Sequence, residues 1–119
     1  MLSHSDRVTS ARFASDGVRV VTTSNDWTAR IWTLTSPAPR VLVLAHEAPV
    51  DFVELDASGA RLLTVSTRAN TIRLWDATTG QPLTQITPPP SLLWSARFSP
   101  NGQRVVTASD DGYARVYDV

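Results

Sequence analysis

Three stretches of the chain carry the same order of hydrophobic and polar positions, and the clearest of them runs from Ala96 to Asp118. The other two run from Ala11 to Thr33 and from Val53 to Asp76. Each stretch contains three short runs rich in β-branched and other apolar residues, separated by polar turns, which is the pattern of short β-strands. Repetition of one phrase along a chain indicates that the same small structural unit occurs several times.

The spacing of the repeated positions identifies the size of this unit. Gly17, Gly59 and Gly102 lie in the first turn of each stretch and are 42 and 43 residues apart. The aromatic residues Trp32 and Trp75, which close the first two stretches, are 43 residues apart. A period of roughly 40–45 residues with four strands per unit is typical of β-propeller blades. A β-sandwich of short strands is the alternative fold, but it gives no reason for a repeating sequence.

The pattern therefore predicts an all-β chain: a partial β-propeller of three blades with antiparallel sheets, in which two blades are four-stranded and the last is three-stranded. We expect a single region, 1–119, with repeats at approximately 4–45, 46–88 and 89–119. The strands are expected at 8–13, 18–24, 28–32, 40–44, 50–55, 60–66, 71–76, 83–87, 93–98, 103–109 and 113–118, with a loop at 35–39. In the third strands, apolar residues alternate with Arg30, Arg73 and Arg115. This period of two places the apolar side chains on one face, which each unit buries against the next.

Composition narrows the classes of function. The hydrophobic fraction of 42% and charged fraction of 18% suit a folded chain. Eleven basic residues, all Arg, balance eleven acidic ones, so no net field attracts nucleic acid or an acidic membrane. The chain has no Cys, its first ten residues lack the features of a signal peptide, and no apolar run reaches membrane-spanning length. We expect a cytoplasmic protein with no nucleic-acid or membrane partner.

The candidate chemical groups favour structure over catalysis. His4 and His46 are 42 residues apart, which equals the repeat, and neither Cys nor a third His accompanies them. We therefore assign them to the repeat and predict no metal, no cofactor and no catalytic residue. A propeller-type hydrolase or lyase with a site in the central channel is the alternative; it would need several acidic or His residues on the first strands, where only Asp51 and Glu54 are available.

The repeated features resemble those of the WD-repeat (β-transducin-like) family of β-propellers. The family unit has a Gly-His near its start, an Asp-Gly turn, a Ser/Thr-rich second strand, an Asp in the next turn and a closing Trp-Asp. The resemblance covers nearly the whole chain, although His4 follows Ser3 rather than a Gly. It implies that each complete blade buries a hydrogen-bonded set of His, Ser/Thr, Asp and Trp. Carried onto this sequence, the sets comprise His4, Thr22, Asp26 and Trp32; His46, Thr64 and Trp75, with Asn70 as the candidate for the missing Asp; and Thr107 and Asp111.

The last unit departs furthest from the family pattern. Pro89 stands where the His is expected, Tyr117 replaces the closing Trp, and the fourth strand is missing. Propellers typically close with about 4–8 blades, so three blades would leave faces exposed. Three explanations follow: a fragment or relic of a larger WD-repeat protein, which we favour; head-to-tail self-association; or a structural subunit that completes the ring of another chain.

The resemblance implies a non-catalytic scaffold that binds other proteins. Its expected contact surface is the rim formed by the unit-start loops and the second turns, near Arg7, Trp27, Glu47, Arg68, Asn70, Asp110 and Tyr113. Trp27 is the most informative member, because the repeat does not require a Trp in a turn and an exposed Trp is a frequent binding hot spot. Packing of Trp27 onto the neighbouring blade is the alternative. Trp94 is expected to be partly buried in a first strand, with the run Pro88–Pro90 covering it.

Overall fold

The computed structural model describes residues 1–35 and 37–119, and within these residues all regular structure is β-strand. The strands of the first sheet are β1 (Val8–Phe13), β2 (Arg19–Ser24), β3 (Thr28–Thr33) and β4 (Arg40–Ala45). Those of the second are β5 (Phe52–Leu55), β6 (Arg61–Ser66), β7 (Thr71–Asp76) and β8 (Pro82–Ile86). The third contains β9 (Leu93–Phe98), β10 (Arg104–Ser109) and β11 (Ala114–Asp118). No helix among the described residues is long and apolar enough to cross a membrane.

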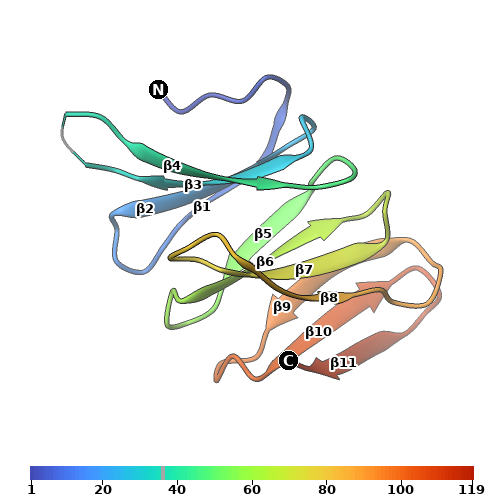
Figure 1. Cartoon of the computed structure of the whole chain (residues 1–119). Helices are drawn as coiled ribbons and strands as arrows, with labels where there is room; N and C mark the ends of the chain where they lie inside the picture. Colours follow the sequence, from blue (N-terminus) through green and yellow to red (C-terminus); the bar gives the residue numbers. More distant parts are fainter. Residues whose placement is uncertain (36) are drawn as a thin grey trace.

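Each sheet is an antiparallel meander in which strands that follow one another in sequence are hydrogen-bonded neighbours. The three sheets follow one another along the chain like successive blades, with the first strands β1, β5 and β9 nearest one another (Figure 1). This arrangement confirms the predicted partial β-propeller with blades of four, four and three strands. A sandwich of two facing sheets is excluded, because each sheet packs on the next one in order.

The turn between the first two strands shows why the repeat begins with this sequence. Gly17 has a φ of +67°, a conformation that glycine adopts without a steric penalty. The carboxylate of Asp16 accepts hydrogen bonds from the backbone N–H groups of Val18 and Arg19, at 2.9 and 3.0 Å. The side chain therefore satisfies donors that the tight turn leaves unpaired, as Asp commonly does in turns.

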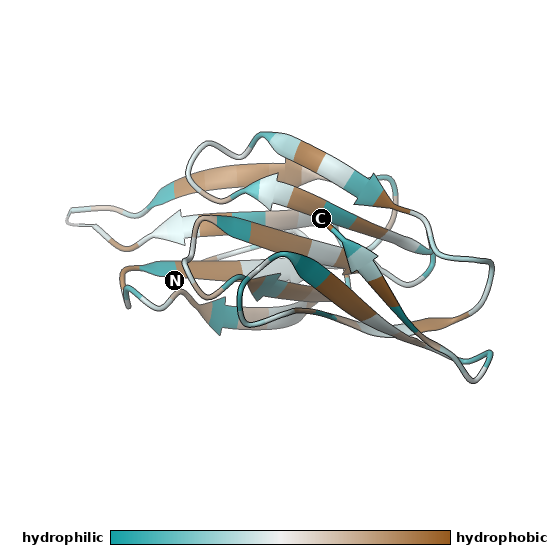
Figure 2. Cartoon of the chain, turned by 90° about the horizontal axis from the view of Figure 1, so that it is seen from below, coloured by the Kyte–Doolittle hydropathy of each residue, from teal (hydrophilic) through white to brown (hydrophobic). Residues whose placement is uncertain are grey.

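The core lies in two layers between the three sheets. One layer joins Val21, Ala29, Ile31 and Leu44 of the first sheet to Val53, Leu62, Trp75 and Ala77 of the second. The other joins Leu63, Val65, Ile72 and Leu74 of the second sheet to Leu93, Ala96 and Val105 of the third. Figure 2 shows the corresponding alternation of apolar and polar positions along the strands.

The predicted burial of the third strands is confirmed in the first two sheets and is wrong in the last. Ile31 and Leu74 are buried between sheets, whereas Val116, which holds the same place in β11, is exposed. No further sheet of the described chain covers that face.

Each sheet lies inside one of the predicted repeats, and the repeat limits themselves stay a prediction. Every strand begins and ends within two residues of its expected position. The predicted loop at 35–39 includes Ser36, which lies outside the described residues.

Candidate functional site

A buried chain of hydrogen bonds joins four side chains in the first sheet. The Nε1–H of Trp32 donates to Thr22 Oγ1 at 2.9 Å, and Thr22 Oγ1 lies 2.7 Å from His4 Nε2. His4 Nδ1 lies 2.9 Å from Asp26 Oδ2. A neutral His4 protonated at Nδ1 satisfies all three contacts, because Thr22 then donates to Nε2 and Nδ1–H donates to the carboxylate.

Asp26 ends this chain and is itself almost fully enclosed. Its side chain is 5% exposed, and it also accepts hydrogen bonds from the backbone N–H groups of Ser5 and Thr28. Burial alone would raise the pKa of Asp26, but the hydrogen bonds from Thr28, Ser5 and His4 outweigh it and hold the pKa well below its usual range. The carboxylate is therefore kept ionised and paired.

The second sheet repeats the chain with one member replaced. Trp75 Nε1–H donates to Thr64 Oγ1 at 3.0 Å, and Thr64 Oγ1 lies 2.7 Å from His46 Nε2. His46 Nδ1 lies 2.9 Å from the carbonyl oxygen of Leu44, so a backbone acceptor takes the place of the carboxylate. Burial, with a smaller effect of the nearby Arg73, lowers the pKa of His46 from 6.5 to about 4, against the opposing effect of the hydrogen bond to the Leu44 carbonyl.

Asn70 was the candidate for the missing member of this second set, and that hypothesis is wrong. Its Nδ2 donates instead to the carbonyl oxygen of Pro88 at 2.8 Å. Asn70 has a φ of +51°, so its place in the turn reflects the tolerance of Asn for left-handed backbone.

The predicted set of the third sheet does not form. Thr107 is buried, but its hydroxyl finds no hydrogen-bond partner among the described residues. Asp111 instead forms an ion pair with Arg115, whose Nη2 lies 2.7 Å from Asp111 Oδ2. The physical reason is the missing His at the position of Pro89, since without an imidazole nothing connects the hydroxyl to the carboxylate.

The rim of the first sheet brings three of the predicted surface residues together. The backbone N–H of Asn25 donates to the carbonyl of Arg7, and that of His46 donates to the carbonyl of Trp27. These bonds place Arg7, Trp27 and Glu47 along one edge, and all three side chains are exposed. The indole of Trp27 is 52% exposed and its backbone φ is +69°. The alternative, in which Trp27 packs down onto the next blade, is therefore wrong.

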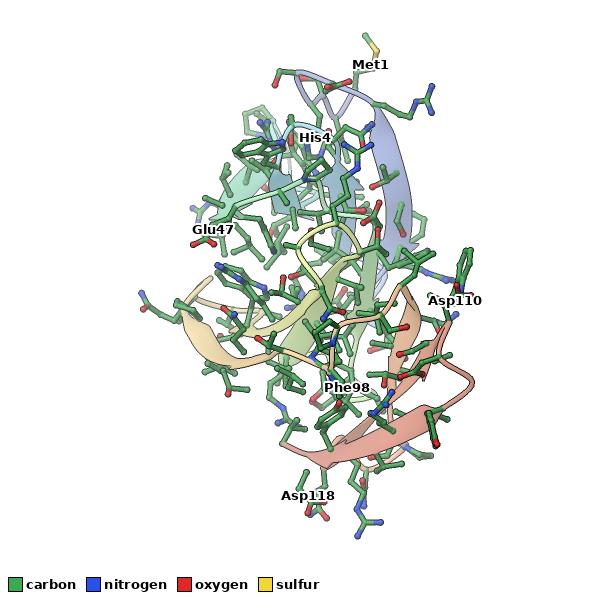
Figure 3. The ribbon with its side chains drawn as sticks, turned by 90° about the vertical axis from the view of Figure 1, so that its right-hand side faces the viewer. Met1, His4, Glu47, Phe98, Asp110 and Asp118 are labelled. Carbon is green, nitrogen blue, oxygen red and sulfur yellow. The ribbon has the colours of Figure 1, made fainter. Side chains whose placement is uncertain are left out.

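The remaining predicted surface residues lie further along the chain. Arg68, Asp110 and Tyr113 are exposed, whereas Asn70 is half-buried by its contact with Pro88. Figure 3 shows Glu47 and Asp110 on opposite sides of the view. Glu47 and Asp110 therefore do not belong to one compact patch, on a molecule whose longest dimension is 47 Å.

Trp94 lies on the surface of the last sheet. The indole is 55% exposed and donates to Asp110 Oδ1 at 3.1 Å, so the predicted partial burial beneath the proline run is wrong. The signal that could have found it lies in the repeat, because Thr9 and Asp51 hold the equivalent positions and are polar. Trp94 joins Asp110 and Tyr113 on the rim of the last sheet.

The inner strands carry no cluster of acids. Arg12, Glu54 and Arg97 occupy the same place in the three first strands, and Glu54 Oε2 lies 3.5 Å from Arg97 Nη1. Burial raises the pKa of Glu54, although the neighbouring arginines oppose this. Asp51 is bound separately, accepting hydrogen bonds from the backbone and hydroxyl of Thr67.

Two hollows border Glu54. One measures about 70 Å³ and the other, which reaches Phe13 and Asp56, about 330 Å³, so the larger lies at the lower limit of the roughly 300–1,000 Å³ of typical ligand pockets. Among the described residues, no three His, Cys, Asp or Glu side chains are grouped to hold a metal ion.

Comparison with known proteins agrees with this architecture. The family model described as WD domain, G-beta repeat matches residues 1–33 and 80–118. Coronin-7 of Homo sapiens is 34% identical over 122 residues, which cover 97% of this chain and 13% of the relative. A guanine nucleotide-binding protein subunit beta of Oryza sativa is 28% identical over 127 residues, covering 100% of this chain and 33% of the relative.

A further relative is pre-mRNA-processing factor 19 of Caenorhabditis elegans. It is 24% identical over 122 residues, covering 98% of this chain and 24% of the relative. The chain thus spans only a small part of the length of the curated relatives it matches. The repeated blades, the two buried His–Thr–Trp chains and the matching family model together show that this chain belongs to the WD-repeat family of β-propellers.

Proposed function

We propose that the chain is a non-catalytic, cytoplasmic scaffold that binds another protein through the rim of its blades, with Trp27 as the principal anchor. The WD-repeat architecture supports a role in protein interaction in general terms. The beta subunit among its relatives belongs, by its name, to an assembly of several chains. The inner strands support the same conclusion, because Glu54 is paired with Arg97 and no chain of nucleophile and base is present among the described residues.

The observation that carries the proposal is the conformation of Trp27. Left-handed backbone costs a residue with a Cβ atom about 1–2 kcal/mol, and the equivalent turn positions are held by Asn70 and Gly112, which tolerate it. Trp27 therefore strains the turn, and it nevertheless leaves 52% of its surface exposed to solvent. Strained residues that the fold does not need are frequent at binding sites.

The charges around Trp27 indicate the kind of partner. Arg7 and Glu47 share this rim, and Glu47 Oε1 also lies 3.6 Å from Arg73 Nη2, so the surface combines an apolar indole with side chains of both charges. Such a surface fits a partner protein with a pocket for the indole and complementary charges at its edge. With no net charge on the chain, the interaction depends on local matching rather than on a long-range field.

The test uses the unchanged chain and the Trp27→Asn variant as immobilised baits to capture binding proteins. Each captured partner is then purified, and its affinity for both forms is measured by titration. We expect Trp27→Asn to melt at the same or a higher temperature, because Asn suits the turn, and to weaken partner binding by about 30-fold, as loss of a hot spot of about 2 kcal/mol implies. Leu83→Asn removes another exposed apolar side chain on the outer strand β8 and should bind normally. Equal affinity of all three forms would contradict the proposal.

A further inference from the structure

The turn between β9 and β10 contains an asparagine followed by a glycine. The chain has three asparagines, Asn25, Asn70 and Asn101, and only Asn101 precedes a glycine, Gly102. In such a pair the backbone nitrogen of the glycine can attack the side-chain amide of the asparagine, because a glycine has no Cβ atom to crowd the approach. Asn101 is therefore the asparagine whose side chain the following backbone nitrogen reaches most easily.

The structure leaves Asn101 open to water and activates its side chain. Asn101 is exposed, and it borders a hollow of about 180 Å³ between its own turn and the turn of Asp56, which joins β5 to β6 (Figure 1). Its Oδ1 accepts hydrogen bonds from Ser99 Oγ at 2.7 Å and from the backbone N–H of Gln103 at 3.1 Å. Donors on this oxygen draw electron density from Cγ and stabilise the charge that develops during attack, as in an oxyanion hole. Asn101 Cγ is therefore an accessible and activated electrophile.

Gly102 connects this turn to the second sheet. Its carbonyl oxygen accepts a hydrogen bond from Nη2 of Arg61, the first residue of β6. The glycine is buried, and a Cβ atom added to it would lie 2.9 Å from Arg61 Nη2. Its N–H donates to the carbonyl oxygen of Ser99 at 2.9 Å. Release of that bond frees the nitrogen to attack, and a short turn opens locally at much lower cost than the whole fold.

The repeat shows what a carboxylate does at this position. Asp16 and Ser58 hold the place of Asn101 in the first two sheets, and Arg19 holds the place of Arg104. Asp16 Oδ2 lies 2.9 Å from Arg19 Nε. An aspartate at position 101 would therefore present a carboxylate to Arg104 as Asp16 does to Arg19, and the turn accommodates it without a change in its backbone.

We propose that Asn101 is a site of spontaneous deamidation and that its isoaspartyl product releases Arg61 from the turn. The nitrogen of Gly102 gives up its proton to water and forms a bond to Asn101 Cγ. The bond from Cγ to Nδ2 breaks, and the departing nitrogen takes up a proton and leaves as ammonia. Water then opens the resulting cyclic imide at either of its carbonyl carbons. Opening at Cγ gives aspartate, and opening at the main-chain carbonyl gives isoaspartate.

The products differ in what they do to the contact with the second sheet. Aspartate keeps the original backbone, so the Gly102 carbonyl stays on Arg61. In isoaspartate the backbone runs through Cβ and Cγ, so an additional carbon separates the Cα atom of position 101 from the nitrogen of Gly102. A tight turn has no room for it, and the carbonyl moves away from Arg61 Nη2. The reaction needs only water and does not involve the rim around Trp27.

The first test measures the reaction itself. The folded chain is incubated at neutral pH below its melting transition and then digested with trypsin, which places the three asparagines in separate peptides, 20–30, 69–73 and 98–104. We expect the peptide 98–104 to gain the mass of deamidation at least about tenfold faster than the other two, and to separate chromatographically into two products of equal mass. A rate at Asn101 no greater than that at Asn70 would overturn the proposal.

The second test measures the effect on the contact with Arg61. Asn101→Ser is the matched control, because Ser58 holds the same place in the second sheet, and it should neither deamidate in this turn nor change on incubation. Asn101→Asp represents the aspartate product and should melt at or above the temperature of the fresh chain. The isoaspartyl fraction of the incubated chain should melt roughly 4 °C lower. In Arg61→Gln, where the contact is already weakened, incubation should lower the melting temperature by less.

Two results of the melting experiments would contradict the release of Arg61. One is an isoaspartyl fraction that melts together with Asn101→Asp, because the two differ only in the path of the backbone. The other is an equal drop on incubation in Arg61→Gln and in the unchanged chain, because the loss would then arise elsewhere in the turn.

Discussion

The sharpest test of the buried polar chain is the substitution Asp26→Ala. It removes the acceptor for His4 Nδ1 and for the backbone N–H groups of Ser5 and Thr28. Water can reach Ser5, which is exposed, but the imidazole is 1% exposed, and its Nδ1 would keep only the 3.2 Å contact with Thr28 Oγ1 in place of the carboxylate. Loss of the partner of a buried polar group costs about 1–3 kcal/mol, so we expect a loss of this size in the free energy of unfolding.

Asp16→Ala provides the matched control. Asp16 also accepts hydrogen bonds from two backbone N–H groups and from Arg19, but it is exposed and water replaces each contact when it is removed. Both variants delete one turn carboxylate from the same sheet, so their difference isolates the effect of burial. We expect Asp16→Ala to be clearly the milder of the two.

Urea denaturation followed by tryptophan fluorescence measures both variants, because Trp32 and Trp75 are buried and report on the first two sheets. A loss of 1–3 kcal/mol also corresponds to a drop of roughly 4–12 °C in melting temperature for a chain of this size. A double-mutant cycle with His4→Ala should show that the two losses are not additive, since each removes the same contact. Equal losses for Asp26→Ala and Asp16→Ala, or strictly additive losses in the cycle, would refute the reasoning.

Two further predictions concern the second and third sheets. The pKa of His46 is about 4 in the folded chain, compared with an ordinary value of 6.5. Between these two pH values the unfolded chain therefore binds more protons than the folded chain. The free energy of unfolding should fall by up to about 3 kcal/mol as the pH drops from 6.5 to 4. His46→Gln should show a shallower fall in urea denaturation across that range, and identical slopes would contradict the assignment. Thr107→Val should be neutral or stabilising by up to about 1 kcal/mol, because the hydroxyl of Thr107 is buried without a partner among the described residues. Thr64→Val should instead lower the free energy of unfolding by about 1–3 kcal/mol, because it leaves the Trp75 N–H unpaired. Similar melting temperatures for Thr107→Val and Thr64→Val would show that the hydroxyl groups of the second and third sheets do not differ in this respect.

Most of the fold could be predicted from the sequence because the same pattern occurs three times. A single run such as Arg104–Ser109 is ambiguous, but three runs in one register, each following a Gly turn, define both the strands and their order. The remaining differences are small and have local causes. β8 begins at Pro82, one residue before its expected start, because an outer edge strand does not need the missing N–H of proline.

The candidate site could be predicted only where the chain keeps the family pattern. The sets around Thr22 and Thr64 follow the expected roles, although Leu44 replaces the acidic member in the second. Asp111 lies four residues before Arg115 across a tight turn, and with Pro89 at the place of the His it forms only this local ion pair. Asp26 also lies beside an arginine four residues later, at 3.7 Å, but there His4 is present and the long-range set forms.

The departures from the repeat divide into two physical kinds. At Thr107, the departure leaves a buried hydroxyl without a partner, so the last blade loses stability and gains no exposed feature. At Trp27 and Trp94, the departure places a large indole on the surface where the sibling positions carry small or polar residues. The first kind concerns how one blade is held together internally, and the second concerns what the rim presents to a partner. Because the two kinds lie at different places, Trp27→Asn should leave the stability of the last blade unchanged, and Thr107→Val should leave rim binding unchanged.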